Sequence, residues 1–151
     1  MIRPSALAVL LVLVAACKRE TPKRELPPAL QEIASGFDEI RRTTTFFVLA
    51  ISADRYEDAY TKLCPGVRAG ISLDAFTTAV RANAYLHGAT KADEMKNGRF
   101  AIDGDTSVEP MTIESTAGTI RADAYLSHDQ HVWCITGISL GGAPALPAPR
   151  K

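Results

Sequence analysis

Residues 30–51 read LQEIASGFDEIRRTTTFFVLAI, and mainly apolar side chains recur in this stretch at alternating steps of three and four. The recurring positions are Leu30, Ile33, Phe37, Ile40, Thr44, Phe47 and Ile51. This spacing places them on one face of a helix. Gly36 weakens the pattern locally, so its strong part begins at Ser35. A coiled coil is the rival interpretation, but it has support over only about three heptads. The stretch therefore predicts a long first helix.

Two shorter helices are predicted to follow. Asp54-Arg55-Tyr56-Glu57 is a capping-box pattern that starts a second helix, and Pro65-Gly66 ends that helix. Ser72 can cap a third helix, and Gly88 ends it as a C-terminal glycine. One face of the third helix holds Leu73, Phe76, Val80 and Ala84.

After the third helix the apolar spacing shortens toward two, which predicts strands. The strands are expected at Phe100–Ile102, 106–115, 120–126 and 131–140. Pro110 indicates that the second of these is an edge strand or contains a bulge. The last strand is apolar on both faces, so it is expected to lie centrally in the sheet. Three helices followed by an antiparallel meander of about four strands predict an α+β domain.

This order of elements resembles the nuclear transport factor 2-like superfamily. The resemblance rests on three passages: residues 46–60, which continue from the long helix into Asp58-Ala59-Tyr60; Ile71-Ser72-Leu73-Asp74-Ala75-Phe76; and Val132-Trp133-Cys134-Ile135. It covers residues 33–140 and extends to small bacterial lipoproteins of this fold with no assigned function. It implies a curved sheet that wraps the long first helix into a cone.

The N-terminus predicts where the protein works. Arg3 precedes an unbroken apolar run from Ala6 to Ala16, which is shorter than the roughly 20 residues that a membrane-spanning helix needs. A charged start, a short apolar run and a small-residue cleavage site are typical of a signal peptide. Val14-Ala15-Ala16-Cys17 resembles the lipobox of bacterial lipoproteins, in which the cysteine carries the lipid. A plain secretory signal with a chance cysteine and a retained membrane anchor are the alternatives.

The expected location is therefore the cell envelope, with the domain held to the membrane through lipid on Cys17. In a Gram-negative cell, Lys18 after the cysteine implies the outer membrane, with the domain facing the periplasm. The domain organisation follows: a signal peptide at 1–16, a polar tether at 17–28, the domain at 29–140 and a disordered tail at 141–151.

The cysteine count predicts one disulfide. If Cys17 carries lipid, Cys64 and Cys134 remain as a pair in a compartment that permits disulfides. Two buried free thiols are the alternative. The broad superfamily does not require this pair, and a bridge would pin the second helix to the last strand.

The distribution of charged residues indicates which classes of partner to expect. Residues 29–149 contain ten Lys or Arg against fifteen Asp or Glu, so nucleic-acid binding is not expected. The basic residues Lys18, Arg19, Lys23 and Arg24 gather in the tether, where they could lie against anionic headgroups.

The candidate ligand-binding residues are Tyr56, Tyr60 and Tyr85, although core tyrosines with a hydroxyl at the rim are the simpler interpretation. His87 is expected to be a charge partner at a helix C-terminus. His128, Asp129 and His131 could bind a metal but lack a fourth ligand, so neither a metal nor a cofactor is predicted. Asp103-Gly104-Asp105 is explained as a turn. The catalytic motifs of the superfamily's enzymes are not identifiable here, so catalytic residues stay unknown.

These observations favour a non-catalytic binding or scaffold module for a small apolar ligand or a protein partner of the envelope. The alternatives are an acid/base enzyme of isomerase or dehydratase type that uses the cone pocket, and a structural homodimer.

Overall fold

The computed structural model describes residues 28–95 and 101–146, apart from the side chains of residues 28–30, 32–34 and 101. The predicted signal peptide, Cys17, the tether up to residue 27, Phe100 and residues 147–151 lie outside the described residues. The described part is an α+β domain in which helices pack against a curved antiparallel sheet, as the sequence predicts.

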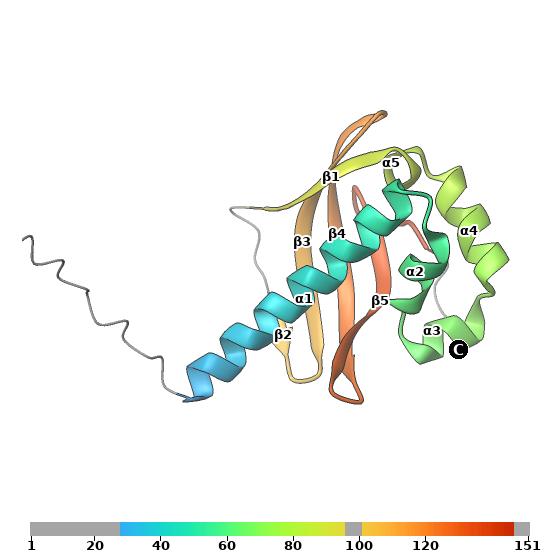
Figure 1. Ribbon diagram of the computed structural model, residues 1–151. Coiled ribbons are helices and arrows are strands. Elements are labelled where there is room, and N and C mark those ends of the chain that lie inside the picture. The colour runs from blue at the N-terminus through green and yellow to red at the C-terminus, as the bar shows by residue number, and fades with distance from the viewer. Residues whose placement is uncertain (1–27, 96–100, 147–151) are drawn as a thin grey trace, which may run out of the picture.

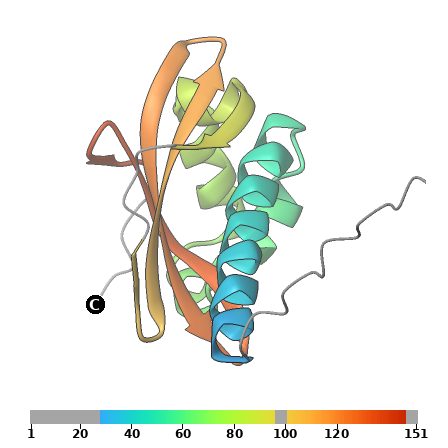
Figure 2. The ribbon, with the colours of Figure 1, turned by 90° about the vertical axis from the view of Figure 1, so that its left-hand side faces the viewer.

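Five helices and six strands make up the described residues. The helices are α1 (Pro28–Ser52), α2 (Tyr56–Thr61), α3 (Pro65–Gly70), α4 (Leu73–Ala82) and α5 (Ala84–His87). The strands are β1 (Ala89–Glu94), β2 (Ala101–Asp103), β3 (Thr106–Ser115), β4 (Gly118–Asp129), β5 (Val132–Leu140) and β6 (Ala143–Pro144). Helix α1 lies across one face of the sheet, and the shorter helices gather near its C-terminal end (Figures 1 and 2).

Helix α1 buries the face that its spacing predicts. Ile40, Thr44, Phe47 and Ile51 are each no more than 1% exposed. Side chains from the facing strands fill the space beneath this part of α1, and they include Ile113, Ala122, Ala124, Leu126, Ile135 and Ile138. The hydrophobic core therefore occupies the concave side of the sheet under α1.

The shorter helices differ in detail from the prediction. Asp54 was expected to cap the second helix. Helix α2 instead starts at Tyr56, so Arg55 occupies the N-cap position, and its side chain makes no capping hydrogen bond. Asp54 instead adopts a left-handed backbone, with φ of 58°, and its carboxylate accepts a hydrogen bond from Tyr56. Pro65 was expected to end a helix but begins α3, because proline needs no N–H partner in a first turn.

The third predicted helix is two helices. Ser72 caps α4 as expected, accepting from the Ala75 N–H. The helix ends at Ala82, and the Asn83 side chain then accepts from the N–H groups of Tyr85 and Leu86 to start α5. Asparagine competes for backbone hydrogen bonds in this way, which explains the break.

The strand order is β1-β3-β4-β5-β6, with β2 also paired to β3, so β1 and β6 are strands that the sequence did not predict. Pro110 was expected at an edge or bulge, yet β3 lies between β1 and β4 and pairs regularly with β4 through Pro110 and Asp123. On the other side of β3, β1 pairs only as far as Met111, and β2 begins its pairing at Val108. Pro110 therefore lies between the part of β3 that pairs with β1 and the part that pairs with β2. Its missing N–H removes no hydrogen bond with β1 or β2.

Strand β5 was expected at the centre of the sheet but borders the two-residue strand β6. Part of its outer edge is closed by the chain after α2, where Cys64 N–H donates to Ile135 O and Ile135 N–H donates to Lys62 O. These bonds satisfy backbone groups that a full neighbouring strand would otherwise pair.

The C-terminal segment was expected to be disordered, but its described part, 141–146, folds back onto β5. Gly141 and Gly142 have φ of 57° and 87°, which only glycine adopts freely, and they make the turn into β6. Ala145 N–H donates to Ile138 O, and the side chain of Leu146 is 7% exposed. The glycine pair is therefore a tight turn and not a flexible linker.

Cys64 and Cys134 lie in contact, with their sulfur atoms 2.05 Å apart in a disulfide that spans 70 positions of sequence. The bridge joins the start of α3 to β5, next to the backbone hydrogen bonds of Ile135. Covalent and hydrogen-bonded links thus hold the same two segments together.

Replacing both cysteines by alanine should lower the free energy of unfolding by about 4 kcal/mol, because a crosslink of this span restricts the unfolded chain. Urea denaturation of the oxidised protein and the Cys64→Ala/Cys134→Ala variant measures the difference. Non-reducing peptide mapping provides the control, since free thiols at both positions in the native protein would contradict the bridge.

Candidate functional site

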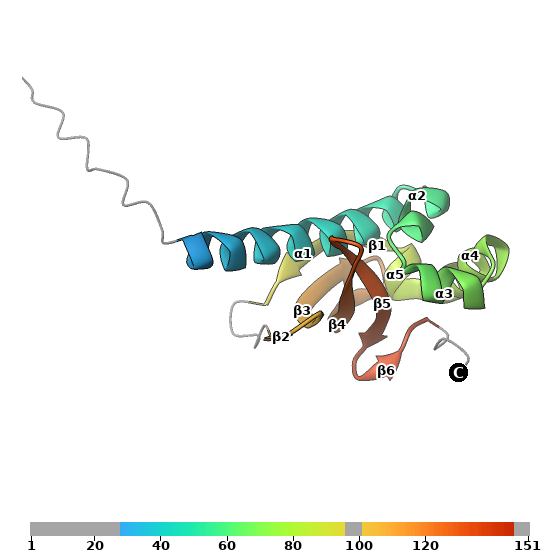
Figure 3. The same ribbon diagram turned by 90° about the horizontal axis from the view of Figure 1, so that it is seen from below.

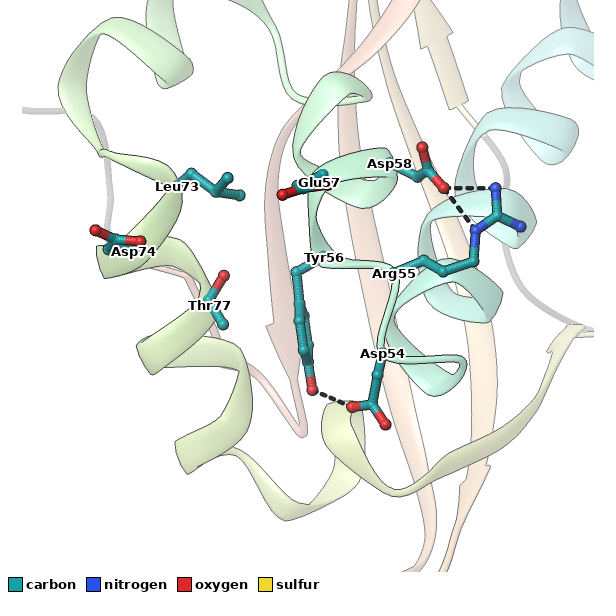
Figure 4. A pocket seen from close by; sticks show the side chains of 8 residues that line it. All are labelled: Asp54, Arg55, Tyr56, Glu57, Asp58, Leu73, Asp74 and Thr77. Atoms are coloured by element: carbon teal, nitrogen blue, oxygen red, sulfur yellow. Dashed lines mark hydrogen bonds and ion pairs between the residues drawn. The ribbon is translucent and has the colours of Figure 1, made fainter.

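An open pocket lies between α2 and the start of α4. Its volume is about 420 Å³. The residues around it come from the loop before α2, from α2 and from α4: Asp54, Arg55, Tyr56, Glu57, Asp58, Leu73, Asp74 and Thr77 (Figure 4). The pocket is therefore formed by two short helices at the C-terminal end of α1.

The lining of this pocket is acidic. Four of its residues carry carboxylates, and one, Arg55, is basic. Arg55 is already engaged by Asp58, with Nη2 and Oδ2 2.5 Å apart. Among the described residues, no ion pair joins Glu57 or Asp74 to a cation, so the pocket presents excess negative charge.

The carboxylates have a local structural cause as well. Glu57 and Asp58 lie in the first turn of α2, and Asp74 lies in the first turn of α4. Carboxylates at these positions interact favourably with the free N–H groups of a helix start. Two helices that begin beside each other thus bring their acidic first turns to one pocket.

Tyr56 is the centre of a hydrogen-bond cluster at the pocket wall. Its hydroxyl donates to Asp54 Oδ1 at 2.5 Å and lies 3.0 Å from His87 Nδ1. Since the hydroxyl has one proton and gives it to Asp54, His87 donates its Nδ1–H to the tyrosine oxygen. The Arg81 guanidinium lies over the ring, 4.9 Å from its centre. The cluster ties the loop before α2 to α4 and α5.

Burial, together with the hydrogen bond to Asp54, raises the pKa of Tyr56 above its ordinary value of 10.0. The residue is therefore a protonated phenol throughout the physiological pH range. It can donate a hydrogen bond, but the arrangement does not favour tyrosinate as a base.

The other two candidate tyrosines do not line this pocket. The Tyr60 hydroxyl lies within hydrogen-bond distance of the carbonyl oxygens of Arg68 and Ile71, at 3.0 and 2.8 Å, and its ring contacts Phe76. Tyr85 is half-buried and packs against the core. The structure therefore places Tyr56 at the pocket and gives Tyr60 a role in holding α2 to the α3–α4 connection. His87, expected to act at a helix C-terminus, ends α5 but also joins the Tyr56 cluster.

A buried carboxylate, Glu109, was missed by the sequence reasoning. It lies on β3 beneath α1, is 3% exposed and accepts a short hydrogen bond from Thr44 Oγ1. Arg41 Nε lies 4.0 Å from Glu109 Oε1, while the same guanidinium contacts Glu94 at 3.0 Å. The sequence contained a sign of this burial. Glu109 lies at every second position along β3 with the buried Ser107, Met111 and Ile113, so all four share the inward face.

Desolvation raises the pKa of Glu109 above its ordinary value of 4.5, and Glu94 acts in the same direction. The hydrogen bond from Thr44 and the charge of Arg41 oppose this rise without cancelling it. Glu109 contacts the middle of α1, whereas the Tyr56 cluster joins α2, α4 and α5. The two groups of ionisable residues thus do not converge on one site.

A second pocket, of about 360 Å³, lies beside the disulfide and includes Cys64, His128 and Asp129 in its lining. The His128 ring contacts Trp133 at 5.1 Å between ring centres, and His131 lies in the hairpin turn with φ of 69°. Within residues 28–95 and 101–146, no three His, Cys, Asp or Glu side chains are grouped so that they could hold a metal ion. His128, Asp129 and His131 therefore do not assemble into a site.

No model of a protein family matches the chain, and no curated protein matches it at a significant level. In the part of the chain that the structure describes, no helix is both long enough and apolar enough to cross a membrane.

Replacing Tyr56 by phenylalanine should lower the free energy of unfolding by about 1 kcal/mol, because the hydrogen bonds of the hydroxyl are lost. His87→Ala should then be less destabilising in the Tyr56→Phe background than alone, since the two residues share one contact. Urea denaturation of the four proteins in this cycle gives the coupling. Tyr125→Phe is the matched control: Tyr125 is 42% exposed, and its loss should change little. Additive effects of the two changes would contradict the cluster.

Glu109 should make stability depend on pH. A carboxyl whose folded pKa exceeds its unfolded pKa contributes stability below the unfolded pKa and loses it as the pH rises through the folded pKa. The wild type should therefore gain stability relative to Glu109→Gln as the pH falls from about 8 to about 5, with each pKa unit corresponding to about 1.4 kcal/mol. Denaturation at several pH values measures this trend. Glu114→Gln, which removes an exposed carboxyl of the same strand, is the matched control. A parallel pH profile for wild type and Glu109→Gln would refute the assignment.

Proposed function

We propose that this protein is a lipid-anchored lipoprotein of the bacterial cell envelope whose domain is a non-catalytic binding module. In this proposal the pocket between α2 and α4 receives a basic segment of a protein partner. We further propose that the domain belongs to the nuclear transport factor 2-like superfamily, which the long α1 across a curved antiparallel sheet supports.

The disulfide supports the location. Cys64 and Cys134 pair with each other, and such bridges persist in oxidising compartments outside the cytoplasm. This pairing leaves Cys17 as the remaining cysteine of three, at the end of the lipobox-like sequence. The count of cysteines and the observed bridge therefore agree with lipid attachment at Cys17.

The acidic pocket is the observation that carries the binding proposal. Several carboxylates around an open hollow attract Lys and Arg side chains, and electrostatic complementarity of this kind guides specificity and association rate. Each exposed pair contributes only about 0.2–1 kcal/mol, so a partner would need to present several basic groups or additional contacts. An extended basic segment of a protein meets this requirement better than a small apolar molecule.

Dense packing on the concave side of the sheet supports a protein partner over an apolar ligand. Beneath residues 40–51 of α1, the space is occupied by fully buried side chains such as Phe47, Val48 and Ile51. An apolar ligand there would have to displace packed core residues, which is unfavourable.

An acid/base enzyme is the second candidate function, and the Asp54, Tyr56 and His87 cluster is the observation that favours it. A carboxylate, a phenol and an imidazole within hydrogen-bond distance can transfer protons. The side chains of Asp54 and His87 are 67% and 46% exposed, so the cluster lies at the surface and not in an enclosed site that excludes water. This exposure favours the binding module.

One membrane preparation can test location and partner together. A photo-crosslinking residue at Thr77, inside the pocket, should capture a partner in intact cells, and the captured peptide should contain Lys or Arg. Glu57→Gln with Asp74→Asn should reduce the product several-fold, because two pocket carboxylates are replaced by neutral side chains of the same size. Intact mass of the same membrane-extracted protein should show removal of residues 1–16 and acyl mass on Cys17.

Two controls complete this experiment. The crosslinker at Thr119, an exposed position on β4, should give no product that depends on the pocket charges, and Asp103→Asn with Asp129→Asn should leave the Thr77 product unchanged. A soluble, unmodified chain would overturn the lipoprotein proposal. A Thr77 product that is undiminished by the loss of the Glu57 and Asp74 carboxylates would overturn the pocket proposal.

A further inference from the structure

The outward side of α1 carries exposed apolar side chains near its C-terminal end. Phe46 is 38% exposed and Leu49 is 45% exposed, although both are large and apolar. They lie three positions apart on one helix and are therefore neighbours on its surface. Two more exposed residues extend this surface: Arg42, one turn earlier on α1, and Ala53, in the turn that directly follows the helix. Arg42, Phe46, Leu49 and Ala53 are called the α1 stripe below.

Two cations that flank α2 border the α1 stripe. Lys62 Nζ lies 4.8 Å from the centre of the Phe46 ring, and the Arg55 guanidinium lies 5.9 Å from it. With Arg42, these residues bring three of the ten basic side chains of residues 29–149 to one place, although Arg55 is also paired with Asp58. Figure 3 shows α1 and α2 along one side of the molecule, with the sheet beneath them. The α1 stripe therefore faces away from the core. Its apolar side chains lie beside one basic residue of the stripe itself, Arg42, and the basic residues of its border.

The length of the chain before α1 allows this side of the domain to reach a membrane that holds lipid on Cys17. If Cys17 carries lipid, residues 18–27 connect it to Pro28 and can span at most about 35 Å. From Pro28 to Phe46, α1 advances about 27 Å. The connection is thus long enough for α1 to lie along the bilayer surface with the stripe downward. The connection itself contributes Lys18, Arg19, Lys23 and Arg24, which carry the same sign of charge as the border of the stripe.

We propose that the α1 stripe and its basic border bind the anionic surface of the membrane in which the protein is anchored. Phe46 and Leu49 insert at the level of the headgroups, while Arg42 and Lys62 contact lipid phosphates, as in helices that lie in a membrane interface. Tethering raises the local concentration of the domain at the bilayer, so a small patch is sufficient. The inference rests on the proposed lipid anchor, and it leaves the acidic α2–α4 pocket available to a partner.

Quenching by brominated lipids tests this orientation. The acylated full-length protein, with Phe46→Trp or Leu49→Trp, is reconstituted into vesicles that contain brominated phosphatidylglycerol. The expected result is a loss of tryptophan fluorescence from both variants beyond that of wild type, whose Trp133 is only 7% exposed. Tyr125→Trp, at an exposed position on β4, is the matched control and should show no added loss.

Charge variants test the basic border. Arg42→Glu with Lys62→Glu should restore the fluorescence of the Phe46→Trp variant, whereas Arg121→Glu, an exposed cation on β4, should leave it quenched. Equal quenching in vesicles of brominated phosphatidylcholine alone would show that anionic lipid is not recognised and would overturn the proposal. Absence of quenching at both stripe positions would also overturn it and would favour a protein as the occupant of the stripe.

The same experiment separates this inference from the anchor. Intact mass of each preparation reports acylation of Cys17. Acylated protein whose stripe variants are not quenched contradicts only the inference. Protein without acyl mass whose stripe variants are quenched contradicts only the anchor.

Discussion

The burial of one face of α1 on the concave side of the sheet is the contact on which the rest of this structure depends. Ile40, Phe47, Val48 and Ile51 are completely buried there, and each such side chain contributes roughly 1.5–3 kcal/mol relative to exposure. This 25-residue helix lies across one face of the curved sheet (Figure 1). Burial of one of its faces determines which helix surfaces remain outside, so the core contact positions both the acidic pocket and the α1 stripe.

One buried charged residue interrupts the apolar packing beneath α1 and has partners there. Glu109 is the carboxylate placed within this interface, and it is held by Thr44 and faces Arg41, two residues of α1 itself. A buried polar group with partners fixes the relative position of two surfaces better than apolar contacts, which tolerate sliding. The α1–β3 contact thus contains both the main apolar burial and a specific polar contact between helix and sheet.

The outer edge of β5 is a second place where the structure depends on long-range contacts. Strand β5 has a full partner only in β4, and an unpaired edge would invite association with other chains. Residues 62–64, the disulfide and β6 close that edge together. Because the same segment follows α2 directly, edge closure also fixes α2, one of the two helices that carry the acidic pocket.

The sequence by itself determined the α+β class, the long first helix, the Ser72 cap and most of the strands, because spacing and capping act within a few residues along the chain. It also named Tyr56 as a candidate ligand-binding residue. Only the tertiary structure decided that Asp54 bonds Tyr56 instead of capping α2, that Pro110 lies in an inner strand, and that Gly141-Gly142 turns the chain back onto β5. These outcomes, like the burial of Glu109 and the meeting of two acidic helix starts, depend on contacts between residues far apart in sequence. No local pattern records such contacts, because their free energy comes from the partner that the fold brings near.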